Sequence, residues 1–205
     1  MSLIENVPNE IVVEIFTHIN DKKQLLNLQL LSQEFQYMIR NTRWIHIQFR
    51  MKNLRYFDYV VNNYKIGNWN FRNLNISEEK FRLLKHCHII DLSHNMIKES
   101  SIKDLKNWHT LNLSYTNVND KILKELSNCH TLNLSHCDKI TDGGIKELSN
   151  CHTLNLSYCK NIIDEGVKHL TNCHILMLHN TKISNETITM LRQHNVIVYK
   201  NDRLI

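Results

Sequence analysis

Residues 132–148 read LNLSHCDKITDGGIKEL, and residues 154–170 repeat the same pattern as LNLSYCKNIIDEGVKHL. Outward from these two stretches, a Cys-His or Trp-His pair recurs every 21 or 22 residues, and each pair precedes a strand-like alternation. The pairs are Cys87-His88, Trp108-His109, Cys129-His130, Cys151-His152 and Cys173-His174. One such unit cannot bury its apolar side alone, whereas stacked units share a continuous core. The period therefore predicts a solenoid whose units are strand, turn and short helix.

The apolar positions of the five units stay in phase. On the strands they are Leu92, Leu113, Leu134, Leu156 and Leu178; five or six residues later come Ile97, Val118, Ile140, Ile162 and Ile183; on the short helices we expect Ile102, Ile122, Ile145, Val167 and Ile188. A degenerate unit with its strand at 73–77 is predicted before them, and a closing strand at 196–199 after them. We expect an α/β fold in which about seven parallel strands line a shallow arc.

The two quoted stretches resemble the cysteine-containing type of leucine-rich repeat. The resemblance implies a short solenoid with a curved parallel sheet, in which Cys137 and Cys159 are buried. In the other units Asn95, Thr116 and Thr181 occupy the place of this second cysteine.

Residues 7–47 do not repeat and predict three short helices. The first follows Pro8 and carries Ile11, Ile15 and Ile19 on one face. Asp21 and Ser32 have the side chains that cap the second and third helices. A segment of about forty residues with this many Leu and Ile side chains cannot bury them by itself. We therefore expect its apolar face to pack on a partner or on the neighbouring domain.

The order of residues in this segment is similar to an F-box: VPNEI (7–11), LLNLQLLSQEF (25–35), then Ile39 and Trp44. The resemblance implies docking to a Skp-type adaptor and, through it, to a cullin ubiquitin ligase. The adaptor-binding positions carried over are Pro8, Ile11, Ile15, Leu25, Leu28, Leu31 and Phe35. We assign 1–48 to the F-box-like helical motif and 72–205 to the solenoid. The range 49–71 is expected to be a linker whose amphipathic helix (54–64) caps the solenoid, together with Trp69 and Phe71.

Thr, Asn and Ser alternate with Leu in the strand motif TLNLS and are therefore expected to point out of the core. Asn112, Asn133 and Asn155 form one expected outward column, and Ser114, Ser135 and Ser157 form another. The Asn column has two interpretations: a polar docking strip for a target protein, or a self-bonded ladder with a structural role. The residue after Ser varies, and Tyr115, His136 and Tyr158 join the three Asn residues as candidate target contacts.

The sequence contains no pattern that indicates catalysis or a cofactor. Cys and His are zinc ligands, but copies on neighbouring strands form a ladder instead of converging on one point. We therefore predict buried Cys and surface His side chains, and no metal site. Gly143-Gly144 is predicted to begin a repeat helix and not a phosphate loop. A net charge of +5 without a run of like charges does not predict nucleic-acid binding, and no apolar run predicts a leader or a membrane span.

These patterns favour a non-enzymatic binding protein. The first hypothesis is a substrate receptor of a Skp-cullin-F-box type ubiquitin ligase, a monomer within that complex, whose repeats bind a target protein. The alternative is a repeat scaffold or decoy that recruits no ligase. For either function we expect a cytoplasmic location, with the nucleus or a host cytoplasm as the other possibilities.

Overall fold

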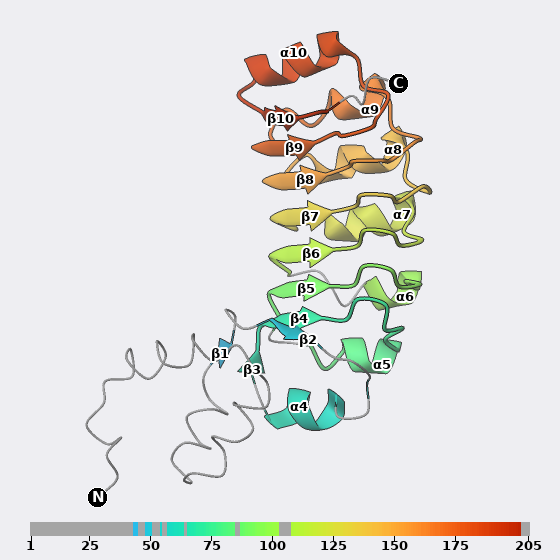
Figure 1. Cartoon of the computed structure of the whole chain (residues 1–205), viewed down its shortest axis with the longest axis vertical. Helices are drawn as coiled ribbons and strands as arrows, with labels where there is room; N and C mark the ends of the chain where they lie inside the picture. Colours follow the sequence, from blue (N-terminus) through green and yellow to red (C-terminus); the bar gives the residue numbers. More distant parts are fainter. Residues whose placement is uncertain are drawn as a thin grey trace, which may run out of the picture.

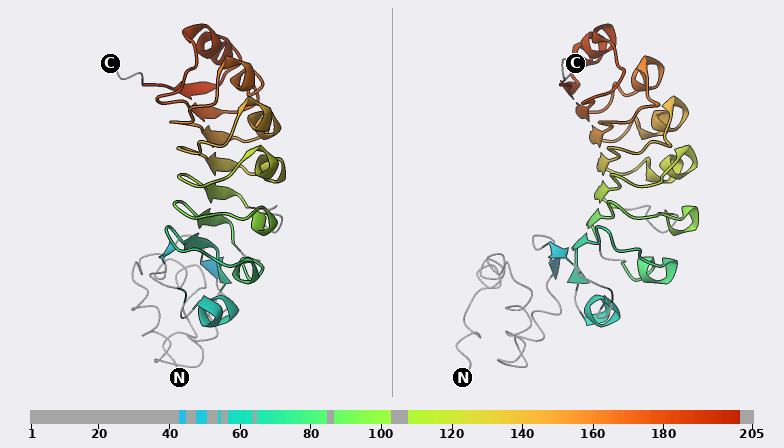
Figure 2. Two further views of the ribbon diagram at one scale, coloured as in Figure 1. Left: turned by 90° about the vertical axis from the view of Figure 1, so that its right-hand side faces the viewer. Right: turned by 45° about the vertical axis from the view of Figure 1, so that its right-hand side comes forward.

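The computed structural model of the chain describes residues 43–44, 48–50, 54, 57–63, 65–84, 87–102 and 108–201. Within these ranges, eight strands form one parallel sheet in the order β10-β9-β8-β7-β6-β5-β4-β2, and β1 pairs with β3 in a separate sheet. The strands stack along the long axis of the molecule, and a short helix follows each strand from β4 to β9 (Figure 1). The turned views show the strands on the concave side of an arc and the helices on its convex side (Figure 2). The predicted curved parallel solenoid is confirmed.

The N-terminal end of the sheet is built from irregularly spaced elements. These are β1 (Arg43–Trp44), β2 (Phe49–Arg50), α4 (Phe57–Asn63), β3 (Lys65–Ile66) and β4 (Asn68–Asn70). Helix α4 lies within the predicted cap helix, with Phe57 fully buried and Leu54 and Val61 packed against the core. Two strands of the large sheet, β2 and β4, thus lie in the range that we expected to be a linker. The predicted three helices of residues 7–47 lie outside the described residues, and the boundaries of the three domains remain predictions.

The repeating strands run in strict register. They are β5 (Ile89–Asp91), β6 (Thr110–Asn112), β7 (Thr131–Asn133), β8 (Thr153–Asn155), β9 (Ile175–Met177) and β10 (Ile197–Tyr199). Leu111 pairs with Leu132 and Leu132 with Leu154, so the same position of each unit stacks on its equivalent. Neighbouring strands lie about 4.8 Å apart. Any side chain type that recurs in the sequence therefore becomes a column in space.

The helices alternate with these strands on the convex side. They are α5 (Glu78–Phe81), α6 (Glu99–Ile102), α7 (Asp120–Leu123), α8 (Asp142–Ile145), α9 (Asp164–Val167) and α10 (Asn185–Gln193), with 3-10 turns η2 (Lys124–Leu126) and η3 (Lys146–Leu148). Asn119, Thr141 and Ser184 cap their helices through side-chain oxygens. Gly143 and Gly144 belong to the first turn of α8, as predicted.

The phase of the first unit was predicted wrongly. Its strand is Asn68–Asn70 and not 73–77, because Trp69 and Phe71 supply its two inward side chains, 1% and 0% exposed. Asn73 has a positive φ of 60°, as His94 does at the same point of the next unit, so residue 73 lies in the turn that follows the strand. On α7, Leu123 lies in phase with Ile145, whereas the expected Ile122 occupies the preceding position; both are buried.

From α7 to α10, each helix is tied to the next by an aspartate. Asp120 accepts hydrogen bonds from the backbone N–H and the hydroxyl of Thr141, at 2.8 and 2.6 Å. Asp142 accepts from the N–H of Ile163 at 2.9 Å, and Asp164 from that of Ser184 at 2.8 Å. These bonds lie between consecutive repeats, so they fix the spacing of the helices as the sheet fixes the spacing of the strands.

The second cysteine column links the units through the turns. Cys137 donates from Sγ to the carbonyl of Leu113, and Cys159 to that of Leu134, both at 3.2 Å. Both thiols are fully buried, which confirms what the family resemblance implied. Asn95 donates in the same way to Phe71 of the preceding repeat at 2.9 Å, whereas Thr116 donates to Leu113 of its own turn at 2.6 Å. A donor is therefore retained where the cysteine is not.

Candidate functional site

The concave sheet face carries the predicted columns of polar side chains. Asn112, Asn133 and Asn155 are half-buried, and each accepts a hydrogen bond at 3.0 Å from the backbone N–H two residues later. The self-bonded ladder interpretation is therefore corrected, because the amide oxygen of each Asn bonds within its own turn. The role of these residues in target binding stays a prediction.

The predicted outward serine column is also wrong. Ser114 and Ser157 are buried and Ser135 is half-buried. The strand ends at the preceding Asn and the chain turns at the Ser, so the alternation of inward and outward side chains no longer applies there. Ser157 instead accepts a hydrogen bond from the N–H of His179 at 3.2 Å, which ties two repeats together.

Along the turns that follow the strands, four aromatic side chains stack into what we call the His–Tyr ladder: His94, Tyr115, His136 and Tyr158. Their ring centroids are 4.4, 4.1 and 4.2 Å apart, and the planes differ by 11–13°. His94, Tyr115 and Tyr158 are exposed and His136 is half-buried. Arg72 extends the row at one end, with a guanidinium nitrogen 3.1 Å from His94 Nε2.

The backbone holds these rings in place. All four residues have φ between 57° and 63°, a left-handed conformation that costs a non-glycine residue about 1–2 kcal/mol. The N–H of Tyr115 bonds the carbonyl of Ser135, and that of His136 bonds Ser157, both at 3.0 Å. Each turn is thus hydrogen-bonded to the next repeat. The rings form a pre-arranged surface, which lowers the entropy cost of using them in binding.

A second row flanks the other end of the strands. This imidazole ladder consists of His109, His130, His152 and His174, with ring centroids 4.4, 4.5 and 4.8 Å apart. All four side chains are exposed, whereas Trp108, Cys129, Cys151 and Cys173 before them are buried. The Nδ1 atoms of His109, His130 and His152 lie 3.1–3.2 Å from the hydroxyl of the following Thr. The predicted pattern of buried Cys and surface His side chains is confirmed.

The titration of these groups follows from their surroundings. Burial raises the pKa of Cys129 and Cys173 to about 11 and that of Cys151 and Cys159 to about 12, so these thiols are poor nucleophiles at neutral pH. Partial burial, followed by the charges of His109 and His152, lowers the pKa of the His130 imidazole. The cysteines are therefore packing groups, and the imidazoles are the titratable groups of the face.

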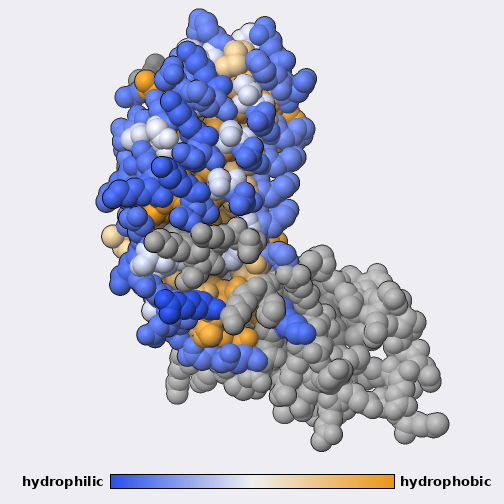
Figure 3. Space-filling model, turned by 180° about the vertical axis from the view of Figure 1, so that it is seen from behind, coloured by the Kyte–Doolittle hydropathy of each residue, from blue (hydrophilic) through white to orange (hydrophobic). Residues whose placement is uncertain are grey.

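The last two strands break the polar pattern, a feature that the sequence reasoning did not single out. At the outward positions that hold Thr and Asn on β6 to β8, strands β9 and β10 carry Ile175, Met177, Ile197 and Tyr199. Ile197 is 43% and Tyr199 50% exposed. The signal was present in the motif ILMLH, where TLNLS is expected. Viewed from behind, the described surface is mainly hydrophilic (Figure 3).

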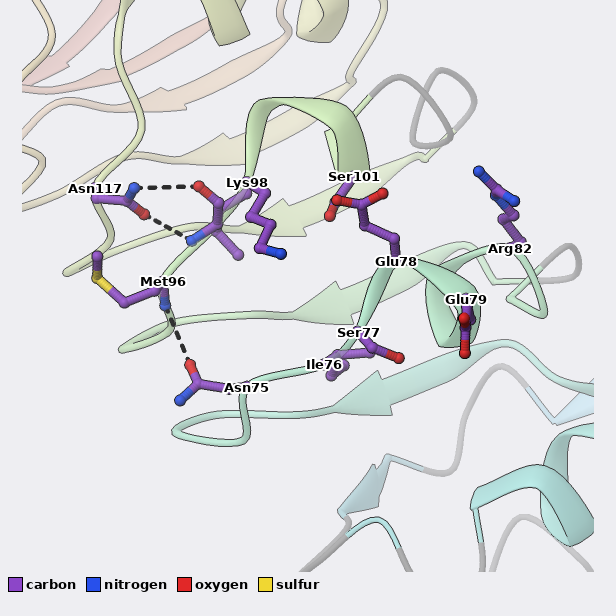
Figure 4. A pocket seen from close by; sticks show the side chains of 11 residues that line it. Asn75, Ile76, Ser77, Glu78, Glu79, Arg82, Met96, Lys98, Ser101 and Asn117 are labelled. Atoms are coloured by element: carbon purple, nitrogen blue, oxygen red, sulfur yellow. Dashed lines mark hydrogen bonds between the residues drawn. The ribbon is translucent and has the colours of Figure 1, made fainter.

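A groove on the loop side lies between α5 and α6. Asn117 bridges across it, accepting from the N–H of Ile97 at 2.6 Å and donating to its carbonyl at 3.1 Å, and Asn75 accepts from Met96 at 3.4 Å. The charged side chains of Glu79 and Arg82 lie at the other end and do not converge with these amides on one point (Figure 4). The amides that line the groove serve the contacts between repeats.

The predicted adaptor-binding residues, from Pro8 to Phe35, lie outside the described residues. Among the residues that the structure describes, no group of three or more His, Cys, Asp or Glu side chains is arranged to hold a metal ion. Over the same ranges, no helix has the length and apolar character to cross a membrane.

Comparison with known proteins identifies the repeat. The family model described as Leucine Rich repeat matches residues 130–149 and 152–170, which are the units with the second cysteine. No curated protein matches the chain. The chain therefore carries leucine-rich repeats, a type of array that binds other proteins and is typically non-enzymatic.

Comparison with solved structures finds similar chains at low identity. The chain is 15% identical to an internalin (inlF) from Listeria monocytogenes, with a TM-score of 0.47 over 67% of this chain and 50% of that one. It is 17% identical to the HAESA receptor kinase ectodomain from Arabidopsis, crystallised with a peptide hormone (TM-score 0.46; 69% and 31% covered). Internalin C2 from the same Listeria species is 18% identical (TM-score 0.45; 65% and 72% covered). The chain thus spans half the length of the first structure and less than a third of the second.

Proposed function

We propose that this chain is a binding adaptor whose concave sheet face holds a target protein. The observation that supports this most directly is the His–Tyr ladder. Its rings lie on a scaffold that the register of the strands fixes, and Tyr115 and Tyr158 are 50% and 37% exposed. Tyrosine is enriched among the residues that dominate binding energy at protein interfaces. Asn112, Asn133 and Asn155 lie beside the ladder and supply polar contacts in the same proposal.

The second half of the proposal concerns the N-terminal motif, residues 1–48. Its resemblance to an F-box supports binding to a Skp-type adaptor and, through it, to a cullin ubiquitin ligase, with the chain acting in the cytoplasm. In that complex the chain is a substrate receptor and performs no chemistry. It raises the effective concentration of the target's lysines near the activated ubiquitin. The contacts proposed for the adaptor are those of Pro8, Ile11, Ile15, Leu25, Leu28, Leu31 and Phe35.

Co-purification with a Skp-type adaptor tests the ligase half. We expect a stoichiometric complex with the wild-type chain and its loss in an Ile11→Asp, Leu28→Asp double variant. A matched Tyr115→Asp, Tyr158→Asp variant keeps the adaptor, because its changes lie on the ladder. Circular dichroism of each variant reports whether the repeats remain folded.

The same experiment separates the two candidate functions. If the wild-type chain binds no adaptor, the ligase half of the proposal is wrong and the chain is a repeat scaffold or decoy. If both double variants lose the adaptor while folded, binding does not depend on the F-box-like positions in particular. Only loss in the first variant with retention in the second supports a substrate receptor.

A further inference from the structure

The imidazole ladder is a row of titratable groups that the proposed function does not yet use. Its four rings are exposed and stacked 4.4–4.8 Å apart along the edge of the concave face. With strands about 4.8 Å apart, the row is about 14 Å long. An extended polypeptide rises about 3.3 Å per residue, so a segment of four or five residues spans the ladder.

Few carboxylates lie near these rings, and two further imidazoles lie at the ends of the row: His88, in register with His109, and His194, in the turn before β10. The turns that lead into the last three, residues 127–128, 149–150 and 171–172, contain only Ser, Thr and Asn, and Glu125, Glu147 and His169 are the next titratable groups upstream. Behind the rings lie the thiols of Cys129, Cys151 and Cys173, which are neutral because they are buried. On strands β4 to β10, Asp91 is the one outward carboxylate, and it bonds Asn70 and the N–H of Ser93. The face therefore carries little negative charge and becomes cationic when the imidazoles gain protons.

Protonation of the free ladder is self-limiting. Two unit charges about 4 Å apart repel each other, and the repulsion is larger near a protein surface than in bulk water. A ligand that places negative charges along the row removes this repulsion, so the bound ladder holds more protons than the free one. Binding and protonation are then linked, and each favours the other.

We propose that the imidazole ladder binds an acidic segment of the target protein and takes up protons as it does so. This inference rests on the proposed function and names the chemistry of its partner. A polypeptide fits the face better than a nucleic acid does, because the row ends beside the apolar patch of Ile175, Met177, Ile197 and Tyr199. An apolar side chain next to the acidic residues fills that patch, and a phosphate backbone offers none.

The direction of the pH effect follows from the linkage. A histidine whose pKa is higher in the complex than in the free protein strengthens binding below its pKa in the complex, and this contribution is lost as the pH rises through that value. We expect an acidic ligand to bind about tenfold more tightly at pH 5.5 than at pH 7.5, which corresponds to a net uptake of about half a proton averaged over these two pH units.

The probe is a fluorescein-labelled peptide of five Glu residues followed by Leu, titrated with the full chain by fluorescence anisotropy at both pH values. Two controls match it in length: a Gln-for-Glu peptide and a thymidine oligonucleotide of equal charge. The variant is His130→Asn, His152→Asn, since Asn retains a polar group near the Thr hydroxyl. His169→Asn, an exposed histidine outside the ladder, is its matched control.

The proposal predicts tightening at pH 5.5 for the Glu peptide with wild type and with His169→Asn, and none with the double variant or the Gln peptide. An equal pH effect in the folded double variant overturns it, as does an oligonucleotide that binds more tightly than the peptide. A target protein that contacts the face equally at both pH values also overturns it, while the proposed function stands. If the peptide binds as predicted but targets cross-link only to the convex side, the proposed function fails instead.

Discussion

Gly144 lies at a close approach between two repeat helices, and a methyl group there should destabilise the whole array. A Cβ at this position would lie 2.8 Å from Asp120 Cα and would also meet the Asp120 carboxylate. Carbon atoms at optimal contact are about 3.5–4.0 Å apart, so the backbone of α7 must move. A Cβ at the neighbouring Gly143 has ordinary contacts, the nearest at 3.6 Å to Thr141 Oγ1.

The magnitude follows from three contributions. Overpacking of this kind costs about 1–3 kcal/mol, and displacing Asp120 weakens its two bonds to Thr141, worth about 1 kcal/mol together at this partly exposed site. Replacing glycine in a helix returns about 0.5–1 kcal/mol. We therefore expect Gly144→Ala to lower the free energy of unfolding by about 2 kcal/mol, and Gly143→Ala to leave it unchanged or raise it by about 0.5 kcal/mol.

Urea denaturation followed by circular dichroism measures both variants under the same conditions. The midpoint of Gly144→Ala should fall well below that of Gly143→Ala, without a change in the slope of the transition. Equal midpoints would refute the claim that the Asp120–Gly144 contact sets the spacing of α7 and α8. A second substitution, Asp120→Ala in the Gly144→Ala background, should restore part of the loss by removing the carboxylate from the contact.

Three further predictions concern other columns. With pKa values of about 12, Cys151 and Cys159 are thiolates in about one molecule in ten thousand at pH 8, so mass spectrometry should find alkylation by iodoacetamide only at the rate of unfolding; rapid labelling of the folded chain would contradict their burial. Tyr115 has a φ of 58°. The free energy of unfolding of Tyr115→Val should be about 1–2 kcal/mol lower than that of Tyr115→Asn, since both variants lose the ring but only Asn tolerates the left-handed backbone. Similar denaturation midpoints for the two variants would contradict the claim that this backbone is strained. Although burial alone would raise it, hydrogen bonds from Ser184 and Thr187 lower the pKa of the Asp164 carboxyl. Its stabilising effect is present above the unfolded-state pKa of about 4 and is lost as the pH falls through the lower folded-state value, so Asp164→Asn should show a shallower loss of stability between pH 5 and pH 2 than wild type in thermal melts.

The repeat architecture was predictable because the same pattern of residues recurs at a fixed period, so that each unit supports the interpretation of the others. The burial of Cys129 and the exposure of His130 followed from the alternation of side chains along a strand. The first unit was placed wrongly because NLNIS imitates the strand motif, whereas the true strand carries Trp69 in place of Leu. The Trp69 ring fills the inward position that leucine fills in the other repeats, and a search for periodic leucines cannot find it.

For the candidate site, the sequence predicted which residues take part but not how they are arranged. Tyr115, His136 and Tyr158 were identified by their variation, but their stacking depends on a left-handed turn that no residue type in the motif indicates. The burial of Ser114 has the same origin, since the strand ends at Asn112, two residues before the serine to which alternation was extended. The apolar patch was missed because Ile175 and Met177 form a patch only beside Ile197 and Tyr199 on the next strand, and this pairing is not visible in the motif of one repeat.

Site-directed photo-cross-linking tests most directly whether the concave face is the protein-binding surface. A benzophenone amino acid replaces Tyr158 in one version of the chain and the exposed Glu147 on the convex side in another, and cross-linked partners from native cells are identified by mass spectrometry. The account predicts a discrete protein cross-linked through position 158, displaced by excess unlabelled wild-type chain, and none through position 147. A displaceable partner found only through position 147 would contradict it, because binding would then belong to the helices and not to the sheet.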